Sequence, residues 1–597
     1  MKRCLLLLLV LAEVTFAGAA NAAVSASNLI TNIPGRTSVN LNGAWQAIVD
    51  PFDNGAGSFY RNAKAKDKSD LVEYSFDASP VLNVPGDWNT QREQLLFYES
   101  SVWYRRMFNY HKRANTRVFV YFGAANYKAT VYLNGEKLGE HEGGFTAFNF
   151  EATSLLREGE NFLIVDVNNA RHADGIPAAR YDWWNYGGIT RDVLLVEEPE
   201  VFIQDSFVQL AKGSRDAIAG WVQLNGAQSP QKVALEISEA GIHETLTTDA
   251  AGRANFRVSA KLELWSPEHP KLYDVVLSSG AEKIHDQIGF RSIEVQGSNI
   301  LLNGKPIFLR GISMHEEAPF RDGRSFSAED AQTLLGWAKE LGCNFVRFAH
   351  YPHNENEVRL ADRMGLLLWS EIPVYWDIDW ANPATLANAE AQLRDMIARD
   401  HNRAAVIFWS MSNETPVKPE RLIFLKQLAQ DAREADSTRL ITSALNRVDN
   451  TAENERTLND PFGEFLDVLG LNEYVGWYGM RPEDADKLQW KSKWEKPLIV
   501  SEFGGGAPFG RHGDTDERWT EEYQANLYQH QIAMVQRMPG LAGMSPWVLM
   551  DFRSPLRLLP GVQDYHNRKG LVSNRGQRKQ AFYTLQEFYK KMAEAEK

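Results

Sequence analysis

Two glutamates follow short apolar segments and could form a catalytic pair. Glu414 ends the segment 409–414 (WSMSNE), and Glu502 ends the segment 498–502 (LIVSE). Two carboxyl groups on either side of a glycosidic bond can break it, because one exchanges a proton with the leaving oxygen while the other acts at the anomeric carbon. If the two groups lie about 5–5.5 Å apart, the sugar is first transferred to the enzyme and its anomeric configuration is retained.

The simpler interpretation of each glutamate is a structural ion pair. For a single glutamate after a strand we would favour that interpretation, because strand ends commonly carry paired charges. Here Glu414 and Glu502 both directly follow predicted strands that lie far apart in the chain. This shared placement favours a catalytic pair over two unrelated ion pairs.

A candidate for binding a carboxylate of the ligand is the loop Asn567-Arg568-Lys569-Gly570 near the end of the chain. An amide and an ammonium group two residues apart in an extended loop can converge on one carboxylate through charge-assisted hydrogen bonds. A neutral hydroxymethyl group could not form such a charge-assisted hydrogen bond with the lysine. The pattern is short and surface loops produce it freely, so its weight comes from its position between Trp547 and the final helix.

The elements that would position these residues begin after Asn303-Gly304, where strand and helix patterns alternate. Helical patterns separate most of the strands, and one starts with the capping box Ser327–Asp330 before the amphipathic run 334–341. Such alternation over about 300 residues predicts a (β/α)₈ TIM barrel. The predicted strands are 307–312, 345–348, 366–369, 406–411, 440–443, 468–471, 498–500 and 544–548.

The active site of such a barrel lies at the C-terminal ends of the strands. We therefore predict a substrate-binding role for the polar and aromatic residues found there. His315 and His350 have a structural alternative as satisfied core histidines, and Glu371 is equally suited to an internal ion pair. Arg347 is predicted to pair with a catalytic carboxylate. The predicted substrate-binding residues at the strand ends are His315, His350, Asn413, Asn472, Tyr474 and Trp547.

The chain before the barrel shows the short alternating runs of β-sandwiches. The segments 118–122 and 129–133 alternate, and Asn134-Gly135 directly after the second segment predicts a hairpin turn. A polar boundary at 197–200 precedes a second set of alternating runs. The predicted domains are a jelly-roll β-sandwich at 23–198, an Ig-like β-sandwich at 199–295 and the catalytic barrel at 296–597.

Composition narrows the function classes. With 597 residues the chain is too long for one hydrophobic core. The 64 Lys and Arg against 77 Asp and Glu, without a sustained basic run, argue against nucleic-acid binding. No His-Glu-x-x-His or comparable cluster is present in the sequence, so no metal site and no cofactor are predicted.

The first residues have the pattern of a secretory signal peptide. Lys2 and Arg3 precede the apolar run 5–12, and Ala20–Ala22 form a small-residue cleavage site. We expect cleavage after Ala22 and a periplasmic or secreted bacterial protein without a membrane segment after cleavage.

Longer motifs in the barrel carry a family resemblance. The segments 344–347 (NFVR) and 350–352 (HYP), together with 400–403 (DHNR) and 409–414 (WSMSNE), resemble the paired signatures of glycoside hydrolase family 2. The family architecture of jelly roll, Ig-like domain and TIM barrel would cover essentially the whole mature chain. By this resemblance Glu414 would be the general acid/base and Glu502 the nucleophile.

The resemblance also points to a substrate class. Asn567 and Lys569 match the Asn-x-Lys motif of family 2 β-glucuronidases, which contacts the uronate carboxylate. Asp182, in the segment 181–189, matches a jelly-roll segment that binds sugar hydroxyls in those enzymes, and Asn413 would bind the sugar 2-hydroxyl. The implied protein is a retaining exo-β-glucuronidase acting on a carbohydrate uronide.

Other interpretations stay open at this stage. The loop 314–319 is closer to galactosidase-type relatives, and Val475 stands where glucuronidases commonly carry a second aromatic residue, so a β-galactosidase or β-galacturonidase is the nearest alternative. A carbohydrate-binding protein on an inactive barrel is the alternative from another class. Self-association into a homo-oligomer is possible for such barrels, but the sequence gives no number of subunits.

Overall fold

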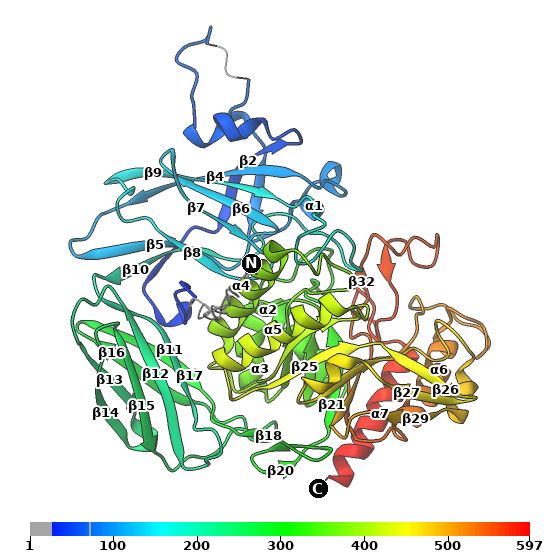
Figure 1. Cartoon of the computed structure of the whole chain (residues 1–597). Coiled ribbons are helices and arrows are strands. Elements are labelled where there is room, and N and C mark those ends of the chain that lie inside the picture. The colour runs from blue at the N-terminus through cyan, green and yellow to red at the C-terminus, as the bar shows by residue number, and fades with distance from the viewer. Residues whose placement is uncertain (1–26, 71–72, 597) are drawn as a thin grey trace, which may run out of the picture.

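The computed structural model describes residues 27–70 and 73–596, so the predicted signal peptide lies outside the described residues. Two β-sandwiches, coloured blue to teal in Figure 1, precede a barrel ringed by helices. The structure confirms the predicted fold class. Within the described ranges, no helix combines the length and the apolar character that crossing a lipid bilayer requires.

The first sandwich packs a four-stranded sheet, in the order β1-β10-β5-β8, against a six-stranded sheet, β3-β2-β4-β9-β6-β7. Asn134 and Gly135 have positive φ values of 54° and 90° and join β6 to β7, which confirms the predicted hairpin. Trp45 and Trp88 are fully buried in its core. The elements are β1 (Ser38–Asn40), β2 (Gly43–Asp50), β3 (Val81–Val84), α1 (Trp88–Gln91), β4 (Ser101–Tyr110), β5 (Thr116–Phe122), β6 (Lys128–Leu133), β7 (Glu136–Glu142), β8 (Phe148–Glu151), β9 (Gly159–Asn168) and β10 (Val193–Pro199).

The second sandwich has a three-stranded sheet, β11-β12-β15, and a four-stranded sheet, β14-β13-β16-β17. A small sheet of β18, β19 and β20 leads into the barrel, and the predicted boundary after residue 295 falls inside β18. The elements are β11 (Phe202–Leu210), β12 (Ala217–Asn225), β13 (Lys232–Ile237), β14 (Ile242–Thr247), β15 (Arg253–Ser259), β16 (Tyr273–Ser279), β17 (Glu282–Ile288), β18 (Ile293–Gln296), β19 (Asn299–Leu302) and β20 (Lys305–Pro306).

The third domain is a closed parallel barrel in the order β21-β22-β23-β24-β25-β28-β30-β31. Seven predicted strands overlap their observed counterparts closely, whereas the eighth was expected at 544–548 and lies earlier. The apolar residues that follow β31 lie in a buried loop and belong to no strand. The backbone N–H of Leu549 in this loop donates to the carbonyl of Ser313. The strands are β21 (Leu309–Met314), β22 (Phe345–Phe348), β23 (Leu367–Glu371), β24 (Val406–Asn413), β25 (Leu440–Leu445), β28 (Leu469–Asn472), β30 (Leu498–Glu502) and β31 (Leu541–Met544).

Helices cover most of the barrel. Ser327 and Asp330 form the predicted capping box at the start of α2. No α-helix joins β25 to β28 or β28 to β30; a three-stranded sheet of β26, β27 and β29 and two 3₁₀ turns lie there instead. These elements are α2 (Ala328–Glu340), α3 (Glu355–Met364), α4 (Pro383–Asp400), α5 (Pro419–Ala435), β26 (Val448–Ala452), β27 (Glu455–Leu458), η7 (Pro461–Glu464), η8 (Pro482–Lys487), β29 (Gln489–Ser492), α6 (Glu521–Val535), β32 (Phe552–Arg553), β33 (His566–Asn567) and α7 (Gln580–Ala595).

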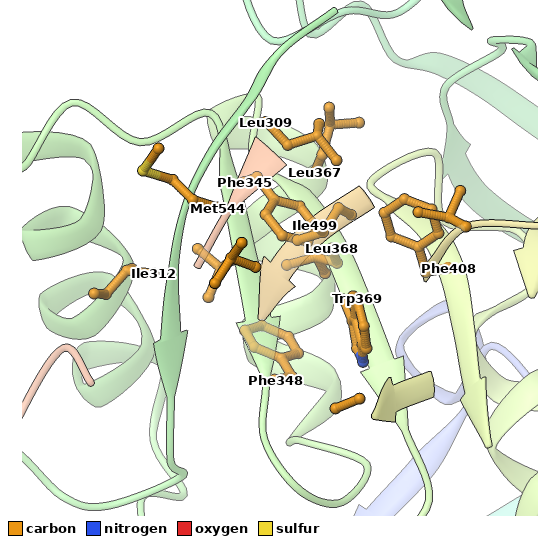
Figure 2. Packing of buried hydrophobic residues seen from close by; sticks show 14 of the residues in the cluster. Leu309, Ile312, Phe345, Phe348, Leu367, Leu368, Trp369, Phe408, Ile499 and Met544 are labelled. Atoms are coloured by element: carbon orange, nitrogen blue, oxygen red, sulfur yellow. The ribbon is translucent and has the colours of Figure 1, made fainter. Parts of the chain in front are cut away.

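Side chains from many strands fill the barrel, so it is a packed core and no channel. Figure 2 shows Phe345, Leu368 and Ile499, which come from β22, β23 and β30, lying close together. All three side chains are fully buried. This core holds the strand ends, and the polar residues that follow them, in fixed positions.

Buried polar contacts join the jelly roll to the loops at the C-terminal ends of the barrel strands. Arg191 Nη2 lies 3.1 Å from Glu316 Oε1, and their side chains are 4% and 1% exposed. Tyr186 donates a hydrogen bond to Glu317, 3.1 Å away, and Trp184 donates its backbone N–H to the carbonyl of Arg553. These contacts bring the jelly-roll segment around Asp182 to the ends of the barrel strands.

Candidate active site

The two predicted catalytic glutamates stand at the ends of β24 and β30, the fourth and seventh strands of the barrel. Glu502 is the last residue of β30 and pairs in register with Asn472 of β28. Glu414 directly follows β24 and has a positive φ of 50°, a conformation that residues other than glycine rarely adopt and that often marks functional sites. Its backbone N–H donates to the carbonyl of Ala444 in β25 at 2.9 Å, which fixes this turn.

Two donors from different strand ends hold Glu502. Arg347 Nη1 donates to Glu502 Oε1 at 2.8 Å, and the Tyr474 hydroxyl donates to Glu502 Oε2 at 2.7 Å. Because each carboxylate oxygen has its own donor, the plane of the group is fixed. Arg347 contacts this carboxylate as expected, and the hydroxyl of Tyr474, a residue predicted to bind substrate, orients the carboxylate.

Glu414 sits in a different environment. Trp376 Nε1 donates to its Oε2 at 3.0 Å, and Asn472 Nδ2 donates to its Oε1 at 3.0 Å. Burial raises the pKa of Glu414 to about 7, and the negative charge of Glu502 contributes in the same direction. Near neutral pH a substantial fraction of Glu414 therefore carries the proton that a general acid needs.

Arg347 links this pair to Glu371. It donates to Glu371 Oε1 at 3.0 Å and to Asn413 Oδ1 at 2.7 Å, in addition to its bond with Glu502. Burial alone would raise the pKa of Glu371, but the charges and hydrogen bonds of Arg347 and His350 together outweigh it and lower that pKa to about 2. Of the two interpretations left open for Glu371, the contacts match the internal ion pair.

Asn413 offers a free donor. Its Oδ1 accepts from Arg347 and, at 3.1 Å, from Asn472, while its Nδ2 is buried and has no partner among the described residues. A buried amide N–H without a partner is costly unless a ligand satisfies it. Since Asn413 directly precedes Glu414, this donor is suited to a sugar hydroxyl, the contact predicted for it.

The two predicted histidines line the same region. His315 Nδ1 lies 3.0 Å from the Tyr351 hydroxyl, and its Nε2 is buried without a partner in the described part of the chain. Burial, followed by the charge of His350, holds the pKa of His315 well below its usual value. His350 Nδ1 lies 2.8 Å from Glu371, and its ring stacks on Trp547 with centroids 4.8 Å apart.

The Asn-x-Lys loop lies inside this site and away from bulk water. Asn567 and Lys569 are 1% and 4% exposed. Lys569 Nζ donates to the Tyr478 hydroxyl at 2.7 Å and lies 5.5 Å from the ring centroid of Tyr474, whose hydroxyl holds Glu502. One aromatic ring thus separates this ammonium group from the predicted nucleophile.

Asp182 brings the jelly roll into the site, but its oxygens already have protein partners. Arg557 donates to it through Nε at 3.0 Å and also through Nη2, and Asn567 Nδ2 lies 3.3 Å away. The Ser554 hydroxyl donates at 2.5 Å. A buried carboxylate needs such partners. If Asp182 binds a sugar hydroxyl, as predicted, that hydroxyl must share the carboxylate oxygens with Arg557.

Several residues of the site were not among those predicted from the sequence. Trp376, which donates to Glu414, follows β23 by five residues and also has a positive φ, 56°. Tyr478, the partner of Lys569, lies in the same loop as Tyr474. An aromatic residue shortly after a strand end was the available signal for both. Arg557 and Ser554 had none, because their partner Asp182 lies more than 370 residues away in the chain.

In residues 27–70 and 73–596, His, Cys, Asp and Glu side chains form no group of three or more that could hold a metal ion. Glu371, Glu502 and Asp182 are paired with arginines, whereas Glu414 and Lys569 contact uncharged side chains.

Comparisons with known families cover nearly the whole described chain. The family model described as "Glycosyl hydrolases family 2, sugar binding domain" matches residues 40–199. The model "Glycosyl hydrolases family 2" matches residues 201–291, and "Glycosyl hydrolases family 2, TIM barrel domain" matches residues 293–594.

Individual relatives agree with these matches. "Beta-glucuronidase" of Paenibacillus borealis is 26% identical over 608 residues, covering 93% of this chain and 97% of that protein. "Beta-glucuronidase" of Rattus norvegicus is 28% identical, covering 94% and 92%. Among solved structures, an uncultured Clostridium sp. β-glucuronidase has a TM-score of 0.82 at 24% identity, covering 95% and 100%. A β-galacturonidase from Eisenbergiella tayi has a TM-score of 0.78 at 24% identity, covering 94% and 98%.

Proposed function

This chain belongs to glycoside hydrolase family 2 and is a glycosyl hydrolase, and we propose that it is a retaining exo-β-glucuronidase. It would remove terminal β-linked glucuronic acid from glycans or small glucuronides. The observation that carries this proposal is the buried Lys569, placed beside Tyr474 at the catalytic pair. The curated relatives named β-glucuronidase support the same substrate class.

In the first step of the proposed mechanism, Glu502 attacks the anomeric carbon and Glu414 donates its proton to the leaving glycosidic oxygen. The bond to the leaving group breaks as the bond to Glu502 forms, which gives a covalent glycosyl-enzyme. Arg347 and Tyr474 hold the attacking carboxylate in place. The raised pKa of Glu414, about 7, supports its role as the proton donor.

The second step reverses the proton transfer. Once Glu502 is esterified, its negative charge is gone, and with it one of the causes that raise the pKa of Glu414. The resulting fall in the pKa of Glu414 makes it a base that can take a proton from water. Water then displaces Glu502, which restores both carboxyl groups and leaves the sugar with its original anomeric configuration.

The uronic acid preference rests on an uncompensated charge. Within the described residues no carboxylate lies within ion-pair distance of Lys569, whose ammonium contacts a hydroxyl and aromatic rings. Removing such a cation from water is unfavourable unless an anion joins it. A uronate carboxylate would supply that anion and accept a further hydrogen bond from Asn567.

A panel of aryl β-glycosides tests the proposal. We expect kcat/KM for the 4-nitrophenyl glucuronide to exceed that for the glucoside and the galactoside by at least about a hundredfold, because discrimination lies in this ratio. A galacturonide in the panel separates the two uronic acids, which differ at C4. Preference for the galactoside would overturn the proposal, and preference for the galacturonide would replace glucuronic acid by its C4 epimer.

We further propose that the protein is exported, since residues 1–22 have the composition of a signal peptide. The mature chain would begin at Ala23 and act on carbohydrate outside the cytoplasm. N-terminal sequencing of the protein from periplasm and medium tests this: a first residue other than Ala23 contradicts the cleavage site, and retention in the cytoplasm contradicts export.

A further inference from the structure

A cavity of about 250 Å³ adjoins the Asn-x-Lys loop. Four of the residues that line it are cationic, namely Arg518, Arg557, Arg568 and Lys569, and none is acidic. A water molecule occupies about 30 Å³ in the liquid. The cavity is therefore several times larger than a single carboxylate group requires, and its lining is strongly positive.

Two of the four cations are wholly or partly compensated by carboxylates behind the lining. Arg557 is paired with Asp182. Arg568 lies 3.4 Å from Asp551, but Lys579 lies closer to the same carboxylate, at 2.7 Å. Two cations thus share one negative charge, so the positive charge of Arg568 is only partly compensated.

The other two cations have no carboxylate partner among the residues that the structure describes. In the described part of the chain, no acidic side chain lies within 4.0 Å of the charged nitrogens of Arg518 or Lys569. One uronate carboxylate at Lys569 would neutralise one of these charges. The charge of Arg518 would remain.

The guanidinium of Arg518 is held in place, although its side chain is exposed. It donates to the backbone carbonyls of Trp477 and Gly476, and it lies over the rings of Trp477 and Tyr523 at 5.4 Å and 5.7 Å from their centroids. Stacking and backbone contacts limit its rotamers, so less conformational entropy is lost when a ligand binds. A fork of donors fixed at a cavity wall is suited to an oxyanion.

The covalent structure of a uronic acid indicates what could reach this cavity. The carboxylate is attached to C5 of the pyranose ring, and C4, with its oxygen, is the neighbouring ring atom. If Asn567 and Lys569 bind the carboxylate, a substituent on O4 must leave the ring beside them. Because both residues line the cavity, that substituent would enter it.

We propose that this cavity is a second anion-binding subsite, which takes a negatively charged substituent on O4 of the terminal uronic acid through Arg518. The substituent is a sulfate ester, which leaves the uronic acid at the end of its glycan and so agrees with the proposed exo action. The inference rests on the proposed uronide specificity and adds to it: the preferred substrate carries two acidic groups on neighbouring ring positions.

Three 4-nitrophenyl β-glucuronides test the inference: the unsubstituted compound and its 4-O-sulfo and neutral 4-O-methyl derivatives. We expect the wild-type enzyme to cleave the 4-O-sulfo derivative with a higher kcat/KM than the methyl derivative. Arg518→Ala should lower kcat/KM for the 4-O-sulfo derivative by about tenfold or more, and leave the unsubstituted and methyl compounds unchanged.

Two further variants serve as controls. Arg518→Lys keeps the charge and should retain a larger part of the anionic preference than Arg518→Ala. Arg511→Ala removes an exposed cation from the same segment outside the cavity lining and should change nothing. Unchanged turnover of the unsubstituted glucuronide shows that the variants are folded.

The outcomes separate this inference from the proposed function. If the unsubstituted glucuronide is cleaved but the 4-O-sulfo derivative is not, or if Arg518→Ala affects all three compounds alike, the second subsite is refuted and the function stands. If no glucuronide is cleaved, the proposed function fails. Calorimetry on Glu502→Gln then decides the subsite by itself: it is refuted if the 4-O-sulfo glucuronide binds no more tightly than the unsubstituted one.

Discussion

At Glu502 a single oxygen-for-nitrogen exchange removes the proposed nucleophile while keeping its shape. Glu502→Gln should lower kcat on 4-nitrophenyl glucuronide by at least about a thousandfold, the scale on which loss of a catalytic group acts. Arg347 would still donate to the amide oxygen, and the Tyr474 hydroxyl would accept from the amide nitrogen, so the fold should be kept. Glu420→Gln, on the first turn of α5, is the matched control. Activity within tenfold of wild type would exclude Glu502 as the nucleophile.

The raised pKa of Glu414 predicts the alkaline side of the pH profile. Below a pKa of about 7 Glu414 is protonated and can act as an acid; above it the proton is lost, so kcat/KM should fall as the pH rises through 7. With a nitrophenyl leaving group, which needs little protonation, Glu414→Gln should retain some activity and lose this limb. A limb that persists unchanged in Glu414→Gln would assign it to another group.

The same coupling has a direct spectroscopic readout. Because the charge of Glu502 is the second cause of the raised pKa, Glu502→Gln should lower the pKa of Glu414, and carboxyl NMR titration of the two proteins would measure the difference. Glu420→Gln should leave the titration of Glu414 where it is in wild type. An unchanged pKa in Glu502→Gln would mean that burial alone raises it.

Lys569 decides selectivity. Lys569→Ala should lower kcat/KM for the glucuronide by about a hundredfold, since a charge-assisted contact to the substrate is lost, and leave an aryl β-glucoside at its low wild-type value. Lys493→Ala, which removes an exposed lysine stacked on Trp494, is the control. Equal losses on both substrates would indicate a structural role for Lys569.

At the scale of elements, the fold could be predicted largely because barrel strands are buried on both faces. Segments such as 345–348 and 498–502 are therefore continuous apolar runs that a sequence displays directly. The run after Met544 misled the prediction, since a buried loop is as apolar as a strand and only the hydrogen-bond ladder distinguishes them. Loops that replace helices around β28 were equally invisible to periodicity.

The residues of the site also fall into two groups, those that the sequence could locate and those that it could not. Glu414, Glu502, Asn472 and Tyr474 could be located because they follow strands, and the barrel geometry brings strand ends together. Arg557 could not, because its place depends on a loop whose partner, Asp182, belongs to another domain. Contacts between loops depend on tertiary packing, and one sequence holds no local signal for them.

The junction between β10 and the first barrel loop makes a stability prediction. Arg191→Ala would leave Glu316 buried with only Arg324, 3.4 Å away, as a charged partner. Loss of one member of a buried pair typically costs about 3–5 kcal/mol. The midpoint of denaturant unfolding should therefore fall clearly, while Arg113→Ala, at a pair whose arginine is 67% exposed, should change stability by about 0–1 kcal/mol. Equal shifts of the unfolding midpoint in the two variants would contradict a stabilising role for the buried ion pair.

For the whole molecule, the important feature is that two domains build one pocket. Asp182 comes from the jelly roll, whereas Arg557, Ser554 and Asn567 come from the last loop of the barrel. The jelly roll thus sets the position of the loop that carries Lys569. Substrate selectivity should depend on the docking of the two domains as well as on the barrel.

A double-mutant cycle measures that dependence. Asp182→Asn leaves Arg557 without its carboxylate, and Arg557→Gln leaves Asp182 unpaired, so each single variant should lower kcat/KM for the glucuronide. Because each change already breaks the shared pair, the double variant should lose less than the sum of both, with a coupling of about 0.5–3 kcal/mol. A cycle between Asp182→Asn and the distant Lys493→Ala should be additive. Additivity in the first cycle would show that the jelly roll acts on the substrate independently of the barrel loop.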